Sequence, residues 1–240
     1  MTANKKSAIK AILFDKDGTL IDFNGTWHAL YKALALEVAE NDDAHAEHLM
    51  AMGGYDRATN SFIAGSELAA GTTPGIVRLW LPNASEQDFA FWRARLDRAF
   101  IEEGPVAAVP VVGLFETIET LHQAGLMLAV VTNDLEQSAE NTLVRFGIRD
   151  KFVAVLGYDS VVNPKPHAEP VHKFCNDKGL VPHEVLVIGD NSHDIEMARN
   201  AGAGFAIGVL TGTGTQEVLA QNSDAVLGSI ADLPEWLGIV

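Results

Sequence analysis

The chain of 240 residues has little of several things that would mark other protein classes. It has one cysteine, Cys175, so no disulfide can form within the chain, and this fits a reducing, cytoplasmic setting. Basic residues are scarce, with 17 Lys and Arg against 32 Asp and Glu, which gives a formal charge of −15. Such a surface repels nucleic acid and anionic membranes, so we expect neither as a partner.

Other signals are missing as well. No stretch of the sequence approaches the ~18 consecutive apolar residues of a membrane span, so we expect a soluble protein. There is no repeat at solenoid periods, no low-complexity tract, and no HxxxH or CxxC spacing for zinc. Cys175 falls on a predicted helix, which favours a buried, inert thiol over a nucleophile.

Beyond about residue 109 the chain alternates between short runs rich in Val, Ile and Leu and longer stretches with helical spacing. Alternating strand and helix signals indicate a parallel sheet covered on both faces, an α/β fold with a Rossmann-like core. Together with residues 11–14, the predicted strands are 127–132, 152–156, 185–188 and 204–207, and the predicted helices are 114–123, 137–146, 168–178 and 195–200.

The segment between residues 22 and 105 has a different texture. It contains no convincing strand, and its helical pieces are predicted at 26–40, 44–52, 75–80 and 86–101. We therefore predict an all-helical cap (22–105) inserted into an α/β core made of 1–21 and 106–240, with Gly104-Pro105 and Val109-Pro110 in the return linker. Phe89, Trp92, Leu96 and Phe100 recur at helical spacing, which indicates packing within the cap.

Two acids stand at the end of the first predicted strand, in the string Phe14-Asp15-Lys16-Asp17-Gly18-Thr19-Leu20. Open α/β sheets bind ligands at the carboxyl ends of their strands, and side chains two apart on an extended strand share a face. Gly18 allows a sharp turn after them. A polar turn is the alternative, because Asp-Gly alone is also a weak hairpin signal.

Polar residues follow three later strands, and each has an ordinary alternative explanation. Thr132-Asn133 could bind phosphate or cap a helix, and Lys165, held between Pro164 and Pro166, could be a fixed or a solvated lysine. Asp190 and Asp194 could bind a metal or serve as helix-cap and first-turn acids. Their common position at the carboxyl ends of buried parallel strands predicts that they converge. Clustered carboxylates need a hard cation, and oxygen ligands suit Mg²⁺.

In order and spacing these residues resemble the four motifs of the haloacid dehalogenase-like hydrolase superfamily. Asp15-x-Asp17-Gly18-Thr19 resembles the first motif, Thr132 the second, Lys165 the third, and Gly189-Asp190-x-x-x-Asp194 the fourth. The helical insert lies where that family carries a cap. The cap, the Thr-Asn-Asp stretch and the glycine- and threonine-rich segment 208–215 are similar to phosphoglycolate phosphatases.

The resemblance implies a Mg²⁺-dependent phosphatase. It implies that Asp15 attacks phosphorus to form an aspartyl-phosphate, and that Asp17 protonates the leaving oxygen and then activates water. Mg²⁺ would be bound by Asp15, the Asp17 backbone carbonyl and Asp190, with Asp194 in support. Phosphate would be held by Thr132, Lys165, Asp17 and backbone N–H groups near Lys16 and Asn133.

Two residues depart from the family pattern. Lys16 stands where an apolar residue is commoner, and Asp134 adds a negative charge near the entrance. Because the useful group at position 16 is its backbone N–H, we expect the lysine side chain to matter little.

The substrate is predicted to be a small phosphorylated metabolite, with 2-phosphoglycolate as a candidate. Arg57, Arg78, Arg93 and His28 of the cap could bind a substrate carboxylate, although most surface arginines do not. A phosphotransferase or mutase with the same intermediate, and a non-catalytic protein that binds phosphorylated metabolites, remain as alternatives. The oligomeric state is left open.

Overall fold

The computed structural model describes residues 6–239 of the chain. Its centre is a six-stranded sheet in the order β5-β4-β1-β6-β7-β8, and every neighbouring pair is parallel. The predicted α/β fold is thus confirmed. The strands are β1 (Ala11–Phe14), β4 (Met127–Val131), β5 (Phe152–Leu156), β6 (Val185–Gly189), β7 (Phe205–Val209) and β8 (Ala225–Leu227).

Helices cover both faces of this sheet, because successive side chains along each buried strand point to opposite sides. Ile12 and Phe14 of β1 belong to one apolar cluster, while Ala11 and Leu13 belong to another. The first cluster is closed by α8 (Leu114–Gln123), α9 (Glu136–Arg145) and α13 (Leu233–Leu237). The second is closed by α10 (Glu169–Lys178), α11 (Ser192–Ala201) and α12 (Gln216–Leu219). Cys175 is buried in the second cluster, as predicted.

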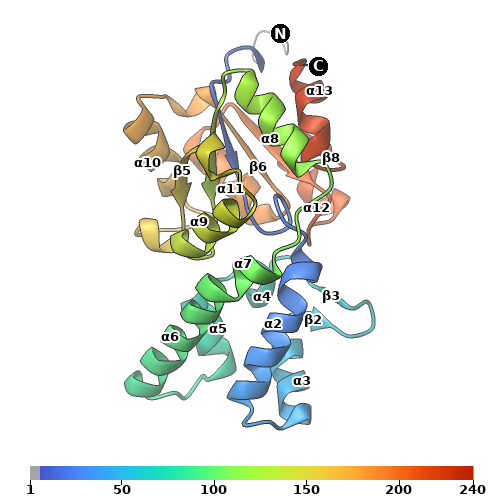
Figure 1. The fold of residues 1–240 in the computed structure, drawn as a ribbon, viewed down its shortest axis with the longest axis vertical. Coiled ribbons are helices and arrows are strands. Elements are labelled where there is room, and N and C mark those ends of the chain that lie inside the picture. The colour runs from blue at the N-terminus through green and yellow to red at the C-terminus, as the bar shows by residue number, and fades with distance from the viewer. Residues whose placement is uncertain (1–5, 240) are drawn as a thin grey trace.

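The insert between β1 and α8 forms the lower half of the molecule in Figure 1 and has an apolar core of its own. Trp27, Leu34, Leu96 and Phe100 are among its buried side chains, and Phe89 and Trp92 pack against them. Its helices are α2 (Phe23–Val38), α3 (Asp43–Met52), α4 (Glu67–Ala70), α5 (Thr73–Trp80), α6 (Glu86–Glu102) and α7 (Gly104–Ala107).

The insert differs from the prediction in two details. Strands β2 (Tyr55–Asp56) and β3 (Ser61–Phe62) pair antiparallel, and two residues are too few to show an alternating pattern in the sequence. Gly104-Pro105, which we predicted as linker, begins the short helix α7, because proline is well tolerated in the first turn of a helix.

The sheet directs its carboxyl ends toward the insert (Figure 1). β1 lies between β4 and β6, so the loops after these three strands are neighbours in space. The chain leaves β1 through residues 15–22 and enters the insert directly, since α2 begins at Phe23. No helix within residues 6–239 has the length and apolar character needed to cross a membrane.

Candidate active site

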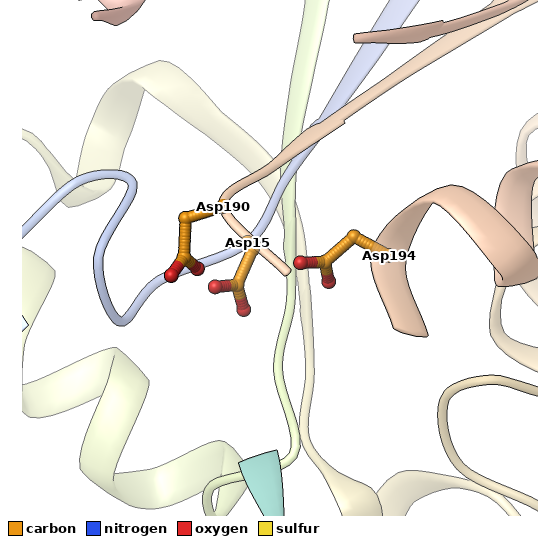
Figure 2. A group of neighbouring side chains, drawn as sticks. All are labelled: Asp15, Asp190 and Asp194. Carbon is orange, nitrogen blue, oxygen red and sulfur yellow. The ribbon is translucent and has the colours of Figure 1, made fainter. Parts of the chain in front are cut away.

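Three aspartates converge at the carboxyl edge of the sheet. Asp15 follows β1, Asp190 follows β6, and Asp194 lies in the first turn of α11. One carboxylate oxygen from each lies within 4.8 Å of the others, and all three side chains are buried. Figure 2 shows the carboxylates pointing into one common space.

Lys165 supplies a positive charge to this cluster. Its Nζ donates to Asp15 Oδ1 at 2.6 Å and to Asp194 Oδ1 at 2.7 Å, and only 1% of its side chain is exposed. The pKa of Asp15 is nevertheless raised to about 6, mainly by burial, which outweighs the attraction of Lys165. Burial and the charges of Asp15 and Asp194 raise the pKa of Asp190 well above its ordinary value. One lysine thus compensates the three acids only in part.

A hard divalent cation fits the rest of this cluster. Within residues 6–239 no hydrogen bond reaches Asp15 Oδ2 or Asp190 Oδ1, because the donors to these two carboxylates bond to the other oxygen of each, Asp15 Oδ1 and Asp190 Oδ2. Buried carboxylate oxygens this close together are a typical ligand set for Mg²⁺, which accepts one or two carboxylates and keeps waters on its other positions. The donor set therefore fits the predicted ion.

The segment after β7 holds Asp190 in place. Thr213 donates to Asp190 Oδ2 through its backbone N–H at 2.7 Å, and Thr211 Oγ1 donates to the Gly18 carbonyl at 2.7 Å. Gly18 has a φ of +81°, and a Cβ there would lie 2.6 Å from Asp190 Cγ and 2.8 Å from the Gly212 backbone. Nothing in the sequence of this glycine- and threonine-rich segment indicated this supporting role.

Thr132 and Asn133 border the same space from the end of β4. Thr132 Oγ1 accepts the backbone N–H of Asp134 at 3.0 Å, which leaves the hydroxyl proton of Thr132 for another acceptor. Asn133 Nδ2 donates to the carbonyls of Ala70 in the cap, at 3.0 Å, and of Lys165, at 3.2 Å. Its Oδ1 is buried with no partner among the described residues.

One carboxylate oxygen of Asp17 accepts hydrogen bonds from two donors. Trp27 Nε1, from α2, lies 2.6 Å from Asp17 Oδ1, and Lys16 Nζ lies 2.8 Å from the same atom. Lys16 Nζ also lies 2.9 Å from Asp134 Oδ2, and 2% of the lysine side chain is exposed. From the sequence, Trp27 could have been recognised only as an aromatic residue of the core, because no local pattern indicates that its indole contacts Asp17.

The two residues that depart from the family pattern thus form an ion pair with each other. Burial alone would lower the pKa of Lys16, but the charges of Asp134 and Asp17 outweigh it and raise that pKa. For Asp134, burial raises the pKa of the carboxyl more than the charge of Lys16 lowers it, so the pKa is raised. Ser138 Oγ donates to the same carboxylate oxygen, Asp134 Oδ2, at 2.6 Å. Our expectation that the Lys16 side chain matters little is not supported by its burial and contacts.

The cap side chains suggested as carboxylate binders lie elsewhere. Arg57 is largely exposed and pairs with Glu47, and Arg93 pairs with Asp97. Arg78 lies over the Phe89 ring, and His28 stacks on Tyr55. None of these four lines the cavity above Asp15. His193 does line it, and burial lowers the pKa of its imidazole to about 3.

Comparison with known proteins agrees with this geometry. The family model for haloacid dehalogenase-like hydrolases matches residues 12–207, a span that includes all four motifs. The chain belongs to the haloacid dehalogenase-like hydrolase family. Pyrophosphatase PpaX of Halalkalibacterium halodurans is 32% identical over 96% of this chain and 98% of its own. Phosphoglycolate phosphatase of Salmonella typhi is 29% identical over 98% and 95%.

A third relative, N-acetylmuramic acid 6-phosphate phosphatase of Pseudomonas aeruginosa, is 32% identical over 82% of this chain and 80% of its own. Family membership and these phosphatases confirm the prediction of a haloacid dehalogenase-like enzyme of the phosphatase type.

Solved structures agree on the fold. A protein from Haemophilus somnus, described as a predicted phosphoglycolate phosphatase, superposes with a TM-score of 0.74 at 26% identity, over 95% of this chain and 98% of its own. CbbY of Rhodobacter sphaeroides, solved with phosphate, superposes with a TM-score of 0.66 at 20% identity, over 94% and 96%. At that identity the second likeness speaks for the haloacid dehalogenase-like fold alone.

Proposed function

We propose that this haloacid dehalogenase-like hydrolase is a Mg²⁺-dependent phosphatase that removes phosphate from a small phosphomonoester through an aspartyl-phosphate on Asp15. The observation that carries the proposal is the buried meeting of Asp15, Asp190 and Asp194 with Lys165 at one edge of the sheet. An anionic nucleophile approaches an anionic phosphate only where positive charge is concentrated; Lys165 supplies part of that charge, and a divalent ion held by the three acids would supply the rest.

The contacts suggest a division of labour. One carboxylate oxygen of Asp15 attacks phosphorus and the other is left to the ion, while Lys165 orients the carboxylate; the bond from phosphorus to the leaving oxygen breaks. Asp17 gives its proton to the leaving oxygen, and later takes a proton from the water that releases phosphate from Asp15. Thr132, Lys165 and backbone N–H groups near Lys16 and Asn133 hold the phosphate oxygens.

Asp15, Asp190 and the Asp17 backbone carbonyl would hold Mg²⁺, with Asp194 in support. When bound, the ion neutralises charge on the transferring phosphate. The candidate substrates include 2-phosphoglycolate. The absence of any disulfide and the buried thiol of Cys175 suit the cytoplasm as the site of action.

Phosphate release from a panel of small phosphate esters tests this proposal. We expect turnover with Mg²⁺, loss with EDTA, and loss of turnover in Asp15→Asn, which is nearly isosteric and keeps the fold. The matched variant Asp17→Asn, given 4-nitrophenyl phosphate, whose leaving group needs no acid, should accumulate phosphorylated protein, visible by intact mass, because hydrolysis of the intermediate loses its base. Wild-type turnover by Asp15→Asn would refute the covalent route. Transfer to a sugar acceptor instead of water would favour the mutase alternative, and phosphate binding without turnover the non-catalytic one.

A further inference from the structure

The cap and the core close over the candidate active site from opposite sides. Trp27 Nε1 of the cap reaches Asp17, and the Ala70 carbonyl of the cap accepts from Asn133 of the core. Residues of both parts line one cavity. With the transferring phosphate held by the core, the leaving group must face the cap side of this cavity.

That side is apolar and aromatic. The cap residues with large side chains on the cavity are Phe23, Trp27, Tyr31, Leu68, Ile76 and Phe100. All of them are buried, and they belong to the apolar core of the insert. The rings pack on one another, with Trp27 and Phe100 edge to face at 5.4 Å between centroids. A leaving group in this place loses its water and gains mainly apolar contacts.

The Lys and Arg side chains of the cap lie outside the cavity. None of them lines the cavity: Lys32, Arg57, Arg78, Arg93, Arg95 and Arg98. Arg95 donates to both carboxylate oxygens of Glu37 on the cap surface, which fixes its guanidinium away from the site. On the core side Lys165 is held between Asp15 and Asp194, and Lys16 between Asp17 and Asp134.

Among the described residues, no spare positive charge lies around the leaving-group space. Asp17 and Asp134 line the cavity, and the cation beside them, Lys16, is already shared between the two. Glu67 lies close by, half-buried under the chain at Gly71 and Gly75, where an added Cβ would meet its carboxylate at 2.2 and 1.7 Å. A second anionic group on the substrate would therefore lose its water beside carboxylates. Because no free cation of residues 6–239 lies there to pair with it, this arrangement opposes the binding of such a substrate.

We propose that the substrate of this site is a phosphomonoester whose leaving group carries no negative charge: a small neutral or amine-bearing alcohol. The inference rests on the proposed phosphatase function and adds the chemistry of the leaving group to it. Phosphoglycolate and pyrophosphate leave as anions, so this site would handle both poorly, although relatives of the chain are named for them.

A matched set of two-carbon esters, which differ in the charge of the leaving group, tests the proposal. The leaving group is neutral in 2-hydroxyethyl phosphate, cationic in O-phosphoethanolamine and anionic in 2-phosphoglycolate, and pyrophosphate is measured alongside. We expect kcat/KM for the better of the first two to exceed that for either anionic substrate at least about tenfold. A preference for 2-phosphoglycolate or pyrophosphate overturns the leaving-group inference and leaves the phosphatase proposal intact. Failure of Mg²⁺-dependent turnover with all four and with 4-nitrophenyl phosphate sinks the phosphatase proposal, and the inference with it.

One substitution tests the reason for the preference. Ala69 lines the cavity from α4, and Ala69→Lys would place an ammonium group where the cap has none. The ratio of kcat/KM for 2-phosphoglycolate to that for 2-hydroxyethyl phosphate should rise about tenfold, while Ala69→Met, of similar length without charge, leaves the ratio unchanged. Because each variant is read as a ratio, a general loss of activity does not affect the result. An unchanged ratio in a folded Ala69→Lys protein refutes the electrostatic explanation.

Discussion

The buried pair of Lys16 and Asp134 offers the sharpest test of the energetics described above. Replacing Lys16 with leucine, an apolar residue of the commoner type, removes the ammonium that lies 2.8 Å from Asp17 Oδ1 and 2.9 Å from Asp134 Oδ2. Asp134, with 7% of its side chain exposed, is then a buried carboxylate without its cation. Breaking a buried pair from one side costs about 3–5 kcal/mol.

The lower end of that range applies here, because three hydrogen-bond donors remain. Ser138 Oγ and the Leu135 N–H still contact Asp134, at 2.6 and 2.7 Å, and Trp27 still contacts Asp17 at 2.6 Å. We expect Lys16→Leu to lose about 3 kcal/mol of unfolding free energy, which for a chain of this size lowers Tm by about 6–12 °C. Removing the orphaned charge as well, in Lys16→Leu/Asp134→Asn, should recover most of that loss, since replacing both partners of a buried pair is often neutral.

Urea unfolding of the wild type, both single variants and the double variant gives the coupling free energy of the pair, provided the m-value stays constant. Activity should follow a different course. The double variant regains stability but still lacks one of the two donors that orient Asp17, so its kcat/KM for an alkyl phosphate should stay about 10–100-fold below wild type. Wild-type stability in Lys16→Leu alone, or no recovery in the double variant, would refute the argument.

Four further changes test other parts of the site and core. Lys165→Ala should lower kcat about 10²–10³-fold, as for loss of a donor to a developing oxyanion, and a near-neutral effect in a phosphate-release assay would make Lys165 a structural lysine only. Asp190→Asn should abolish the rise in Tm that Mg²⁺ gives the wild type, measured by thermal shift, whereas Glu217→Gln on the exposed face of α12 keeps that rise. Gly18→Ala should inactivate, because its Cβ would collide with Asp190 at a positive φ; activity near wild type would contradict the close approach seen here. Cys175 should not react with a thiol reagent until the protein unfolds, because its side chain is buried and burial raises the pKa of its thiol; rapid labelling of native protein would disagree.

The core of the fold was readable from the sequence because its signals are local and strong. Strands 11–14 and 152–156 and helix 114–123 agree with β1, β5 and α8 at both ends. β1 is buried on both faces, β5 is apolar throughout although Val153 is exposed, and α8 carries one clear apolar stripe, so each run can be recognised from its composition. β8 escaped notice because it is a three-residue edge strand of half-buried side chains, which gives no continuous apolar run.

Those residues of the site that lie at the ends of strands could be predicted from the sequence. Asp15, Asp190 and Asp194 are brought together by parallel topology, which the alternating pattern predicts. The supporting contacts of Thr213 and Trp27 were not readable, because each joins segments whose approach only the folded chain fixes. The Lys16–Asp134 pair belongs to the same class: both residues were noticed as unusual, yet their separation in sequence concealed that each compensates the other.

Because Trp27 donates a hydrogen bond to Asp17, its fluorescence can report on the state of the site. An indole that donates to a carboxylate emits according to the field of that carboxylate, and Trp27 is one of four tryptophans in the chain. Of these, Trp27 alone lines the cavity within the described residues. Replacing Trp80, Trp92 and Trp236 with phenylalanine would leave one tryptophan, at the junction of cap and core, so that ligand arrival and cap movement can be followed without any added label.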